Sequence, residues 1–270
     1  MTTQLDDPTQ ELWIEGRWEE LIPLARAQLR AARKAGNGAL EADALGQLSF
    51  LFGQTLRAVD EGRAARQELQ VRRRLGEPLG LARALGTLAA HLLDRGRKAA
   101  ALAHVREALA VYRSLGPDLE DSLELAELGQ LYQQADCQME ARAVFQEALG
   151  TTPGTSRFVV RAAVLQSLSV SHEALGELAD AMRCQFEALV CRNRVALDCA
   201  DGLRRLAELH LKAGERWQAG LLLREAVANA LEHGNAPAAR VAQERLSTLA
   251  GPPPRAPWRL LGRAGPFGSC

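Results

Sequence analysis

Apolar and polar residues follow one another along most of the chain with the spacing of amphipathic helices, and glycine-containing breaks separate one helix from the next. In residues 85–115, two apolar-patterned segments lie on either side of Gly96, and in the second the apolar positions recur at steps of three and four. Gly116 and Pro117 end that second helix, because glycine accepts the left-handed conformation and proline cannot extend the hydrogen-bond ladder. The pattern predicts a hairpin of two helices.

Such a hairpin cannot bury its own apolar faces, so its stability depends on neighbouring copies that stack against it. The sequence supplies these copies at steps of forty residues, with one step of thirty-eight near the end. Four columns stay in register: the glutamates Glu107, Glu147, Glu187 and Glu225, the alanines Ala101, Ala141, Ala181 and Ala219, the alanines Ala108, Ala148, Ala188 and Ala226, and the inter-helix residues Gly16, Gly96, Asp136, Gly176 and Gly214. We therefore predict an all-α protein, an α-solenoid of about six stacked helical hairpins.

The second hairpin departs from these columns. Leu56 stands where other hairpins have glycine or aspartate, and Glu61 and Glu68 stand in the two alanine columns. A carboxylate at a position that otherwise holds a small apolar residue disfavours close packing of helices. We expect the internal packing of this hairpin to be the least secure of the six.

The predicted solenoid spans residues 8–250, and a solenoid grows lengthwise without a second domain. Its last segment, residues 236–250, is a helix without a partner, which we interpret as a cap over the final hairpin. Residues 1–7 are a polar tail. Residues 251–270 are rich in proline, glycine and arginine, and we expect disorder; the alternative is a docking peptide for a partner or for the protein's own groove. Any flexing within the array is expected at residues 150–154, the break with the most punctuation.

These features resemble the tetratricopeptide repeat family. The resemblance covers residues 8–233 and lies in the turn glycine, the two alanine columns, a small residue in the first helix and a larger residue three positions later. The small residues are Ser49, Ala89, Gly129, Ser169 and Ala207, and the larger ones are Phe52, Leu92, Tyr132, His172 and His210. The period near forty differs from the family's commonest period of about 34 and is similar to that of kinesin light chains and bacterial peptide-sensing regulators. The resemblance implies a role in protein interactions.

Composition and charge exclude other classes. Aromatic residues make up 4% of the chain, which favours close helix packing over a sheet. Lys+Arg and Asp+Glu are equal at 33 each, so no global field attracts nucleic acid or an anionic membrane. No apolar run of about eighteen residues is present to span a bilayer, and residues 1–7 lack the pattern of a secretory signal. Five cysteines without a disulfide framework indicate reduced thiols in a cytoplasmic protein.

The concave wall of the superhelix is the candidate site, because the first helix of each hairpin lines it. The helical register places these residues on the wall: Gln47, Phe50, Gln54, Arg83, Thr87, Asp94, Glu127, Gln130, Gln133, Gln134, Gln166, Ser167, Val170, Glu173, Asp201, Arg204, Arg205, Glu208 and Lys212. Glutamines suit hydrogen bonding to a peptide backbone, and Arg204 with Arg205 suits an acidic group. A solvated surface residue is the simpler interpretation for any single one of them, and it is as a set that they form the best candidate site. The lysines and asparagines with which family members clamp a C-terminal carboxylate are not in place, which disfavours a chaperone-tail receptor.

Other chemistry finds little support in the sequence. Cys184, Cys191 and Cys199 are spaced by seven and eight, which suits small buried residues better than a metal or redox cluster. His172 and His210 fall in a packing column, where we expect interior rings with a satisfied nitrogen. The chain has no phosphate-binding glycine loop and no nucleophile elbow, so we predict no enzymatic activity, no cofactor and no metal.

Two functional hypotheses remain. The favoured one is a protein-interaction scaffold that binds a peptide or protein segment in the concave groove. The alternative is a peptide-sensing regulator, in which ligand binding alters the superhelix and acts through a separate output partner. The sequence leaves the identity of the partner and the oligomeric state open.

Overall fold

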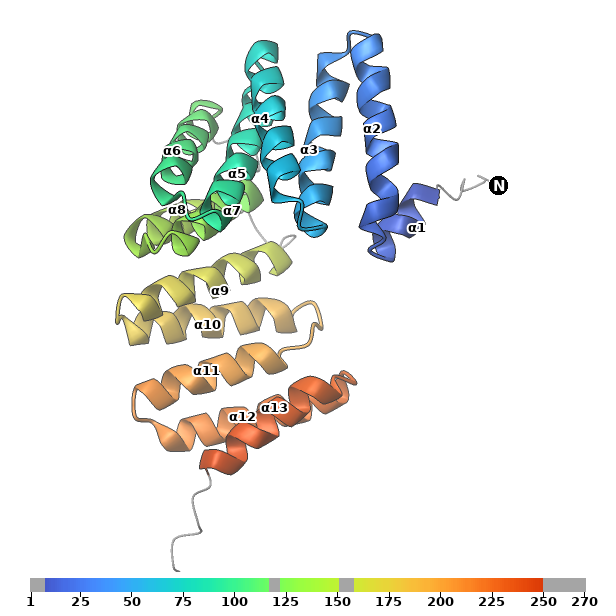
Figure 1. The fold of residues 1–270 in the computed structure, drawn as a ribbon. Coiled ribbons are helices and arrows are strands. Elements are labelled where there is room, and N and C mark those ends of the chain that lie inside the picture. Colours follow the sequence, from blue (N-terminus) through green and yellow to red (C-terminus); the bar gives the residue numbers. More distant parts are fainter. Residues whose placement is uncertain (1–7, 117–121, 151–157, 250–270) are drawn as a thin grey trace, which may run out of the picture. The chain divides into compact units, whose positions relative to one another are not determined.

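The computed structural model describes residues 8–116, 122–150 and 158–249, and within these ranges the secondary structure is entirely helical (Figure 1). The prediction of an all-α fold is therefore confirmed. The chain divides into two compact units, residues 1–153 and residues 154–270, and the boundary falls in the break at residues 150–154. The two predicted tails, Pro117 and the last residue of the predicted cap, Ala250, lie outside the described residues.

The described residues of the first unit form eight helices. They are α1 (Pro8–Ile14), α2 (Trp18–Lys34), α3 (Gly38–Gln54), α4 (Ala58–Leu75), α5 (Pro78–Asp94), α6 (Lys98–Ser114), α7 (Ser122–Gln134) and α8 (Gln138–Gly150). Helices α3 and α4, α5 and α6, and α7 and α8 pack as hairpins, and each hairpin also contacts the next one along the chain. The short α1 packs on α2, which gives the first, shortened hairpin.

The second unit contains α9 (Phe158–Ala174), α10 (Leu178–Asn193), α11 (Ala200–Lys212), α12 (Arg216–Glu232) and α13 (Ala236–Leu249). Two hairpins, α9 with α10 and α11 with α12, pack against each other, and α13 lies on α12 and α11. The capping helix is therefore confirmed, and it buries Ala239 and Ala242, while Val241 is exposed.

A left-handed residue ends nearly every helix of these hairpins. Such residues recur at steps of twenty from Gly16 to Asp136 and from Gly176 to Ala196, with position 156 outside the described residues: Gly16, Gly36, Leu56, Gly76, Gly96, Gly116, Asp136, Gly176 and Ala196, followed by Gly214 and Gly234. At the inter-helix turns the next residue donates its amide to the carbonyl five positions earlier, as from Arg97 to Leu92 at 2.8 Å. This bond closes a Schellman turn, which satisfies the last carbonyls of the first helix and sets the direction of the second.

The alanine columns are the positions where helices meet most closely. Ala101, Ala108, Ala141, Ala148, Ala181, Ala188, Ala219 and Ala226 are all fully buried. The small-residue column of the first helix has the same role, since a Cβ on Gly129 would collide with the Phe145 ring. Small side chains at these positions let the backbones approach, which is why the repeat requires them.

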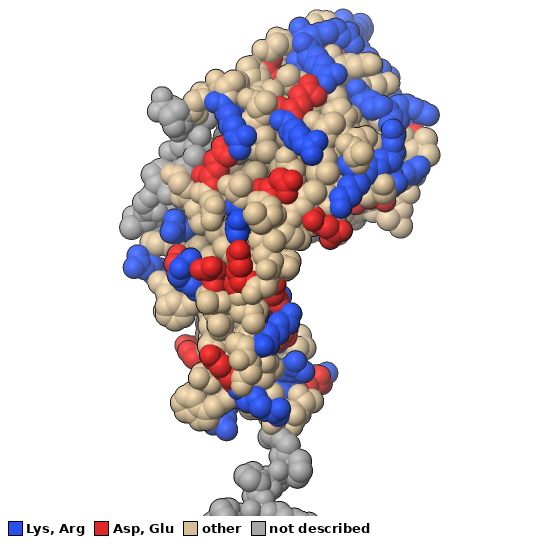
Figure 2. Space-filling view, turned by 90° about the vertical axis from the view of Figure 1, so that its left-hand side faces the viewer, with Lys and Arg blue, Asp and Glu red and all other residues tan. Residues whose placement is uncertain are grey.

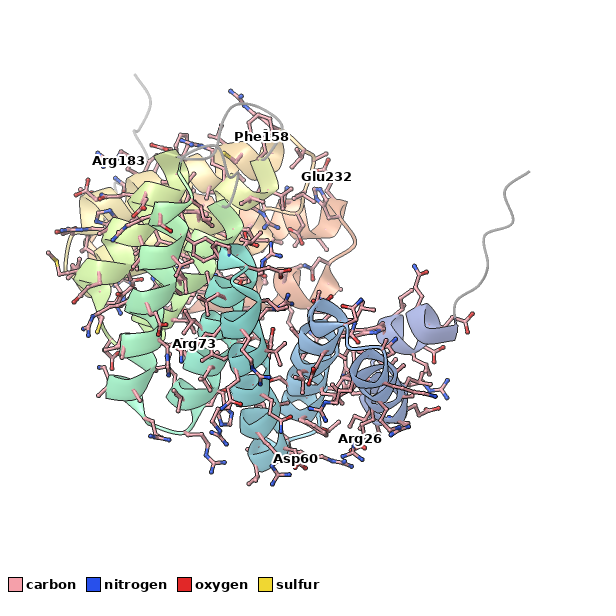
Figure 3. The ribbon with its side chains drawn as sticks, turned by 90° about the horizontal axis from the view of Figure 1, so that it is seen from above. Arg26, Asp60, Arg73, Phe158, Arg183 and Glu232 are labelled. Carbon is pink, nitrogen blue, oxygen red and sulfur yellow. The ribbon has the colours of Figure 1, made fainter. Side chains whose placement is uncertain are left out.

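Ion pairs link the second helices of successive hairpins in the first unit. Arg73 on α4, labelled in Figure 3, donates to Glu107 on α6 at 2.8 Å, and Arg113 on α6 donates to Glu147 on α8 at 2.8 Å. Donor and acceptor both recur at a step of forty, which explains two members of the glutamate column, Glu107 and Glu147. Forty residues after Arg113 the sequence has Pro153, at the boundary between the units.

Candidate functional site: a cavity lined by the first helices of three hairpins

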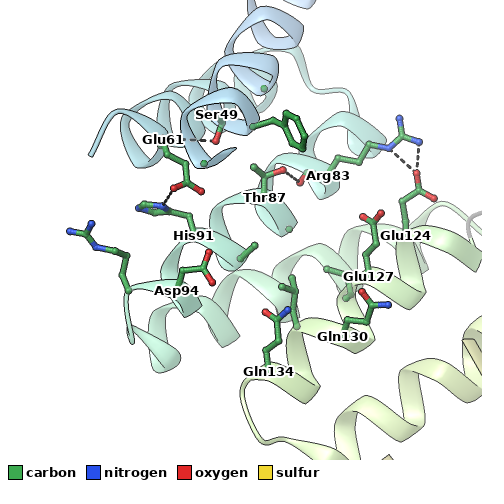
Figure 4. A pocket seen from close by; sticks show the side chains of 18 of the residues that line it. Ser49, Glu61, Arg83, Thr87, His91, Asp94, Glu124, Glu127, Gln130 and Gln134 are labelled. Atoms are coloured by element: carbon green, nitrogen blue, oxygen red, sulfur yellow. Dashed lines mark hydrogen bonds and ion pairs between the residues drawn. The ribbon is translucent and has the colours of Figure 1, made fainter. Parts of the chain in front are cut away.

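A cavity of about 1040 Å³ lies in the first unit, on the side formed by the first helices α3, α5 and α7 (Figure 4). Small residues on these helices, among them Gly46, Gly53, Gly86 and Ala90, belong to its lining and leave room above the backbone. Polar side chains from the three helices project around this space. The helical register therefore produces one continuous wall from three separate hairpins.

Eight of the predicted wall residues line this cavity: Phe50, Gln54, Arg83, Thr87, Asp94, Glu127, Gln130 and Gln134. Gln47 and Gln133 lie on the same helices but do not belong to the lining. The helical register was sufficient to find most of this wall because residues at steps of three and four share one face of a helix.

Arg83 on α5 is held by Glu124 at the beginning of α7. The guanidinium Nε of Arg83 donates to Glu124 Oε1 at 2.9 Å. The hydroxyl of Thr87 donates to the Arg83 carbonyl at 3.2 Å, one turn back on the same helix (Figure 4). Sequence analysis did not include Glu124 in the wall, although it lies three residues before Glu127 and so on the same helix face.

His91 and Glu61 form a second ion pair within the lining. His91 is 6% exposed, and its Nδ1 lies 3.2 Å from Oε2 of Glu61 on α4. A Cβ at Gly62 would overlap the His91 ring, so this glycine makes room for the imidazole. The signal in the sequence was Glu61 itself, an acidic residue in an alanine column, but its partner is on the next hairpin and no local pattern identifies it.

Two carboxylates in the lining have no such partner. Across residues 8–116, 122–150 and 158–249, Asp94 and Glu127 form no hydrogen bond or ion pair, and Figure 4 shows both on the cavity wall, on α5 and α7. Partial burial raises the pKa of Glu127, and the nearby charge of Glu124 raises it further, while Arg83 opposes the shift. Glu127 is therefore an exposed carboxylate on the wall whose charge is disfavoured by Glu124 and which has no bound cation in the described part of the chain.

The glutamines of the wall are available to a ligand. Gln54, Gln130 and Gln134 have exposed side chains, and within the described part of the chain their amides make no hydrogen bond. Each amide offers two donors and one acceptor group, which is the combination needed to bond a peptide main chain. The cavity therefore combines unpaired amides with unpaired carboxylates.

An aromatic cluster adjoins the cavity at Phe50. The Phe50 ring stacks on Trp13 of α1 with centroids 5.3 Å apart, and Trp18 of α2 meets it edge-on at 5.7 Å. Phe50 is 44% exposed and Trp13 is 39% exposed, so the cluster presents apolar surface to solvent. Clusters of exposed aromatic side chains are typical of sites that bind another molecule.

The predicted wall residues of the second unit are mostly paired with one another. Glu173 on α9 accepts hydrogen bonds from both Arg205 and Lys212 on α11, and its side chain is 15% exposed. Arg204 donates to Glu208 at 2.6 Å on the same helix. Gln166 and Ser167 are half-buried on α9, Val170 is partly exposed, and Asp201 lies 3.5 Å from Arg204. These residues remain a predicted surface in the second unit, with its charges largely balanced internally.

Two histidines and three cysteines of the second unit lie at packing positions. His172 is buried and its Nδ1 lies 2.5 Å from Glu177, and His210 makes the same contact with Glu215 one hairpin later. Cys184, Cys191 and Cys199 are buried, and burial raises the pKa of the Cys184 and Cys199 thiols. The predicted buried thiols and satisfied ring nitrogens are confirmed, whereas the prediction of an interior ring holds for His172 but not for His210, which is half-buried.

Arg72 shows a limit of the charge pattern. A run of three arginines late in a helix, Arg72 to Arg74, is the sequence pattern of a solvated face that complements the helix dipole, but the Arg72 side chain is only 13% exposed. It donates to Asp43 on α3 at 2.5 Å and to Glu77 at 3.2 Å, and it lies 4.0 Å from the buried Glu68. A solvated face is therefore wrong for Arg72, because it packs against the preceding helix, where Asp43 binds it, as well as against nearby carboxylates of its own stretch of chain.

Basic and acidic side chains lie interspersed over most of the face shown in Figure 2, in keeping with equal numbers of the two. Among the described helices, none is long and apolar enough to cross a membrane.

The fold and the cavity together define a class: stacked two-helix repeats with small-residue columns, which is the fold of tetratricopeptide-like repeat proteins. The solved structure of BtubC (BKLC) from P. vanneervenii matches with a TM-score of 0.58 at 18% identity, covering 94% of this chain and 96% of that one. A putative kinesin light chain from P. anserina with nearly identical TPR-like repeats matches with a TM-score of 0.56 at 18% identity, covering 64% and 87%.

A third solved structure, a Rap protein complexed with competence and sporulation factor, matches with a TM-score of 0.58 at 13% identity, covering 89% of this chain and 72% of that one. No family model matches the sequence, and no curated protein matches it either. At these identities the likeness establishes the fold, and the function has to be argued from the cavity itself.

Proposed function

We propose that this protein is a non-enzymatic protein-interaction scaffold whose cavity between α3, α5 and α7 binds an extended peptide or protein segment. The observation that carries the proposal is the single wall formed by three successive first helices, with unpaired amides and carboxylates facing one space. A stack of hairpins presents such a wall as a rigid surface, which lowers the entropic cost of binding.

The size and chemistry of the cavity support a peptide. Its volume of about 1040 Å³ is at the upper end of the range of roughly 300–1000 Å³ typical of pockets for small molecules. A segment of several residues fits a space of this size, and the exposed amides of Gln54, Gln130 and Gln134 match the donors and acceptors of its main chain. The aromatic cluster at Phe50 offers a site for an apolar side chain.

The second unit extends the proposal. Gln166, Glu173, Arg204, Arg205, Glu208 and Lys212 are proposed as a further contact surface for a protein ligand. Since Arg205 and Lys212 already bind Glu173, and Arg204 binds Glu208, an acidic group on the ligand would have to compete with carboxylates of the chain. We therefore assign the main binding contribution to the cavity in the first unit.

A ligand-switched regulator is the second candidate, and the fold likeness to the Rap protein solved with its factor favours it. In that case a peptide in the cavity would change the affinity for a separate output partner. The two candidates differ in whether binding of one molecule alters binding of another.

Affinity capture with a variant that fills the cavity tests the proposal. Thr87 is exposed on the cavity wall, so Thr87→Trp places an indole in the space without disturbing the core. Glu140→Trp, on an exposed position of α8 outside the cavity, is the matched control. We expect partner proteins identified by mass spectrometry from the native cell to be lost with Thr87→Trp and retained with Glu140→Trp. Equal capture by both variants would refute binding in the cavity.

The same experiment separates the two candidates. A scaffold retains its second partners whether or not the cavity is occupied. For a regulator, filling the cavity changes the set of partner proteins captured by other surfaces of the chain. The cavity is filled either by the Thr87→Trp indole or by an added peptide.

A further inference from the structure

The charges of the cavity lining do not balance. The lining contains four carboxylates, on Glu61, Asp94, Glu124 and Glu127, and two guanidinium groups, on Arg83 and Arg95. His91 adds a positive charge only when protonated. The lining is therefore net negative, although the whole chain carries equal numbers of basic and acidic residues. A concave surface of one charge sign concentrates ligands of the opposite sign.

Internal ion pairs account for only part of this charge. Glu124 is bonded to Arg83, and Glu61 lies against His91. Asp94 and Glu127 remain without a hydrogen bond or ion pair anywhere in the described parts of the chain. They lie on different helices, α5 and α7, and both belong to the lining of the same space (Figure 4).

Glu127 is the more informative of the two carboxylates. Burial and the neighbouring Glu124 both disfavour its charged form, which is why its pKa is raised. A cation brought next to Glu127 by a ligand would remove this penalty, so part of the binding free energy comes from relief of an existing electrostatic cost. A second anion in the same place would increase the cost, so an acidic ligand is disfavoured here.

The aromatic cluster adds a second preference. Phe50 lines the cavity and stacks on Trp13, so the wall offers an aromatic surface as well as carboxylates. Apolar side chains and cations both bind favourably to aromatic faces.

We propose that the cavity selects a basic segment: an extended peptide of a partner protein with lysine or arginine side chains that bond to Asp94 and to Glu127, and with an apolar residue that packs on Phe50. This inference rests on the proposed function, since it names the chemistry of the segment bound in the same cavity. Charge complementarity with the two unpaired carboxylates carries it. The amides of Gln54, Gln130 and Gln134 hold the main chain, and the ion pairs fix the register of the segment.

Selection from a random peptide library displayed on phage, with the full chain as bait, tests the inference. We expect lysine and arginine to be enriched in peptides selected on the wild-type chain. Asp94→Asn with Glu127→Gln keeps the shape of both side chains and should abolish this enrichment. The matched control is Glu140→Gln with Glu187→Gln, which removes two exposed carboxylates outside the cavity and should leave the enrichment unchanged.

Individual peptides then give the magnitude. A selected basic peptide, measured by fluorescence polarisation, should bind about tenfold more weakly to Asp94→Asn/Glu127→Gln and should bind normally to the control pair. Asp94→Lys with Glu127→Lys should shift selection toward aspartate and glutamate. A synthetic peptide of residues 251–270, which carries Arg255, Arg259 and Arg263 and no acidic residue, serves as a competitor. If it displaces selected peptides more effectively than any external sequence, a segment of this chain is the occupant and an external partner is refuted.

The remaining outcomes separate the two levels of the proposal. Suppose that the selected peptides lose binding to the Thr87→Trp variant but show no enrichment of lysine or arginine. That result would overturn the charge inference and leave peptide binding in the cavity intact. Peptides that bind equally to the wild-type chain and to Thr87→Trp, or a failure to select any peptide, would overturn the proposed function itself.

Discussion

The hairpin of α3 and α4 and the hairpin of α5 and α6 are consecutive copies of one repeat, and they differ at three defining positions. Leu56, Glu61 and Glu68 in the former correspond, forty residues later, to Gly96, Ala101 and Ala108 in the latter. The helices have nearly identical lengths in both hairpins. The fold therefore tolerates two charged residues and a strained turn in the hairpin of α3 and α4. The next hairpin, α5 with α6, has alanines and a glycine at the same positions.

The three departures all lie at the cavity or directly behind it. Leu56 and Glu61 belong to the lining, and Oε1 of Glu68 lies 3.0 Å from where a Cβ on Gly46 would stand, another lining residue. Departures from local structural rules tend to collect where a protein binds other molecules. The comparison teaches that the repeat has been altered at the hairpin that begins the cavity, and each alteration predicts a measurable cost.

The largest effect is expected from a carboxylate in the regular hairpin. Ala108 is fully buried, so Ala108→Glu should lower the free energy of unfolding by about 3 kcal/mol or more. Glu68 has Arg72 one turn later, whereas Tyr112 occupies that position after Ala108. Adding Tyr112→Arg should therefore recover part of the loss, as measured by urea unfolding at pH 7. Ala110→Glu, at an exposed position, is the control, and an equal loss in that control would show that burial is not the cause.

The next effect is a pH dependence that originates at Glu68. Burial raises its pKa from 4.5 to about 7, Asp43 adds to the shift and Arg72 opposes it. The folded chain thus binds more protons than the unfolded chain between these values, so the free energy of unfolding falls as pH rises through this window and levels off above it. A shift of this size corresponds to about 3 kcal/mol.

Glu68→Gln should remove this contribution, because the amide does not ionise. Unfolding of the variant and the wild-type chain at pH 5 and pH 8 measures it: the variant gains relative stability at the higher pH. Glu140→Gln, at an exposed position, should leave the wild-type pH dependence in place. An unchanged slope in Glu68→Gln would assign the dependence to other groups.

The smallest effect concerns the turns. Leu56 has φ 58° and is 91% exposed, so it bears the cost of the left-handed conformation without burying its side chain. Leu56→Gly should raise the free energy of unfolding by about 1 kcal/mol, and Gly96→Leu should lower it by about as much. The expected shift of the thermal midpoint is about 2–4 °C in each direction. Leu56→Ala keeps the Cβ and with it the strain, so a gain equal to that of Leu56→Gly would point to another cause.

The repeat itself was predictable from the sequence because its evidence is local. A glycine or aspartate at the turn and alanines at fixed offsets report the backbone conformation and the contact distance at those positions. Asp136 illustrates this well: it stands in the inter-helix glycine column, aspartate tolerates the left-handed region, and its φ is 54°. The turns between hairpins follow the same twenty-residue spacing, which only the structure revealed.

The cavity was partly predictable, for a related reason. Helical register placed Asp94, Gln130 and Glu127 on the correct faces, since register needs only the position of each helix. Pairing between helices was not accessible, because a contact such as that of Glu61 with His91 depends on how two hairpins pack. The helical register predicts which residues face the cavity. It does not predict which of their charged groups form ion pairs with other helices.

The ion pairs between second helices have a consequence for how such arrays grow. Helix α6 carries both an acceptor for the preceding hairpin, Glu107, and a donor for the following one, Arg113. A tandem duplication of this stretch of forty residues would insert a module that already matches its neighbours on both sides. Lengthening of the chain then requires no new interface between second helices.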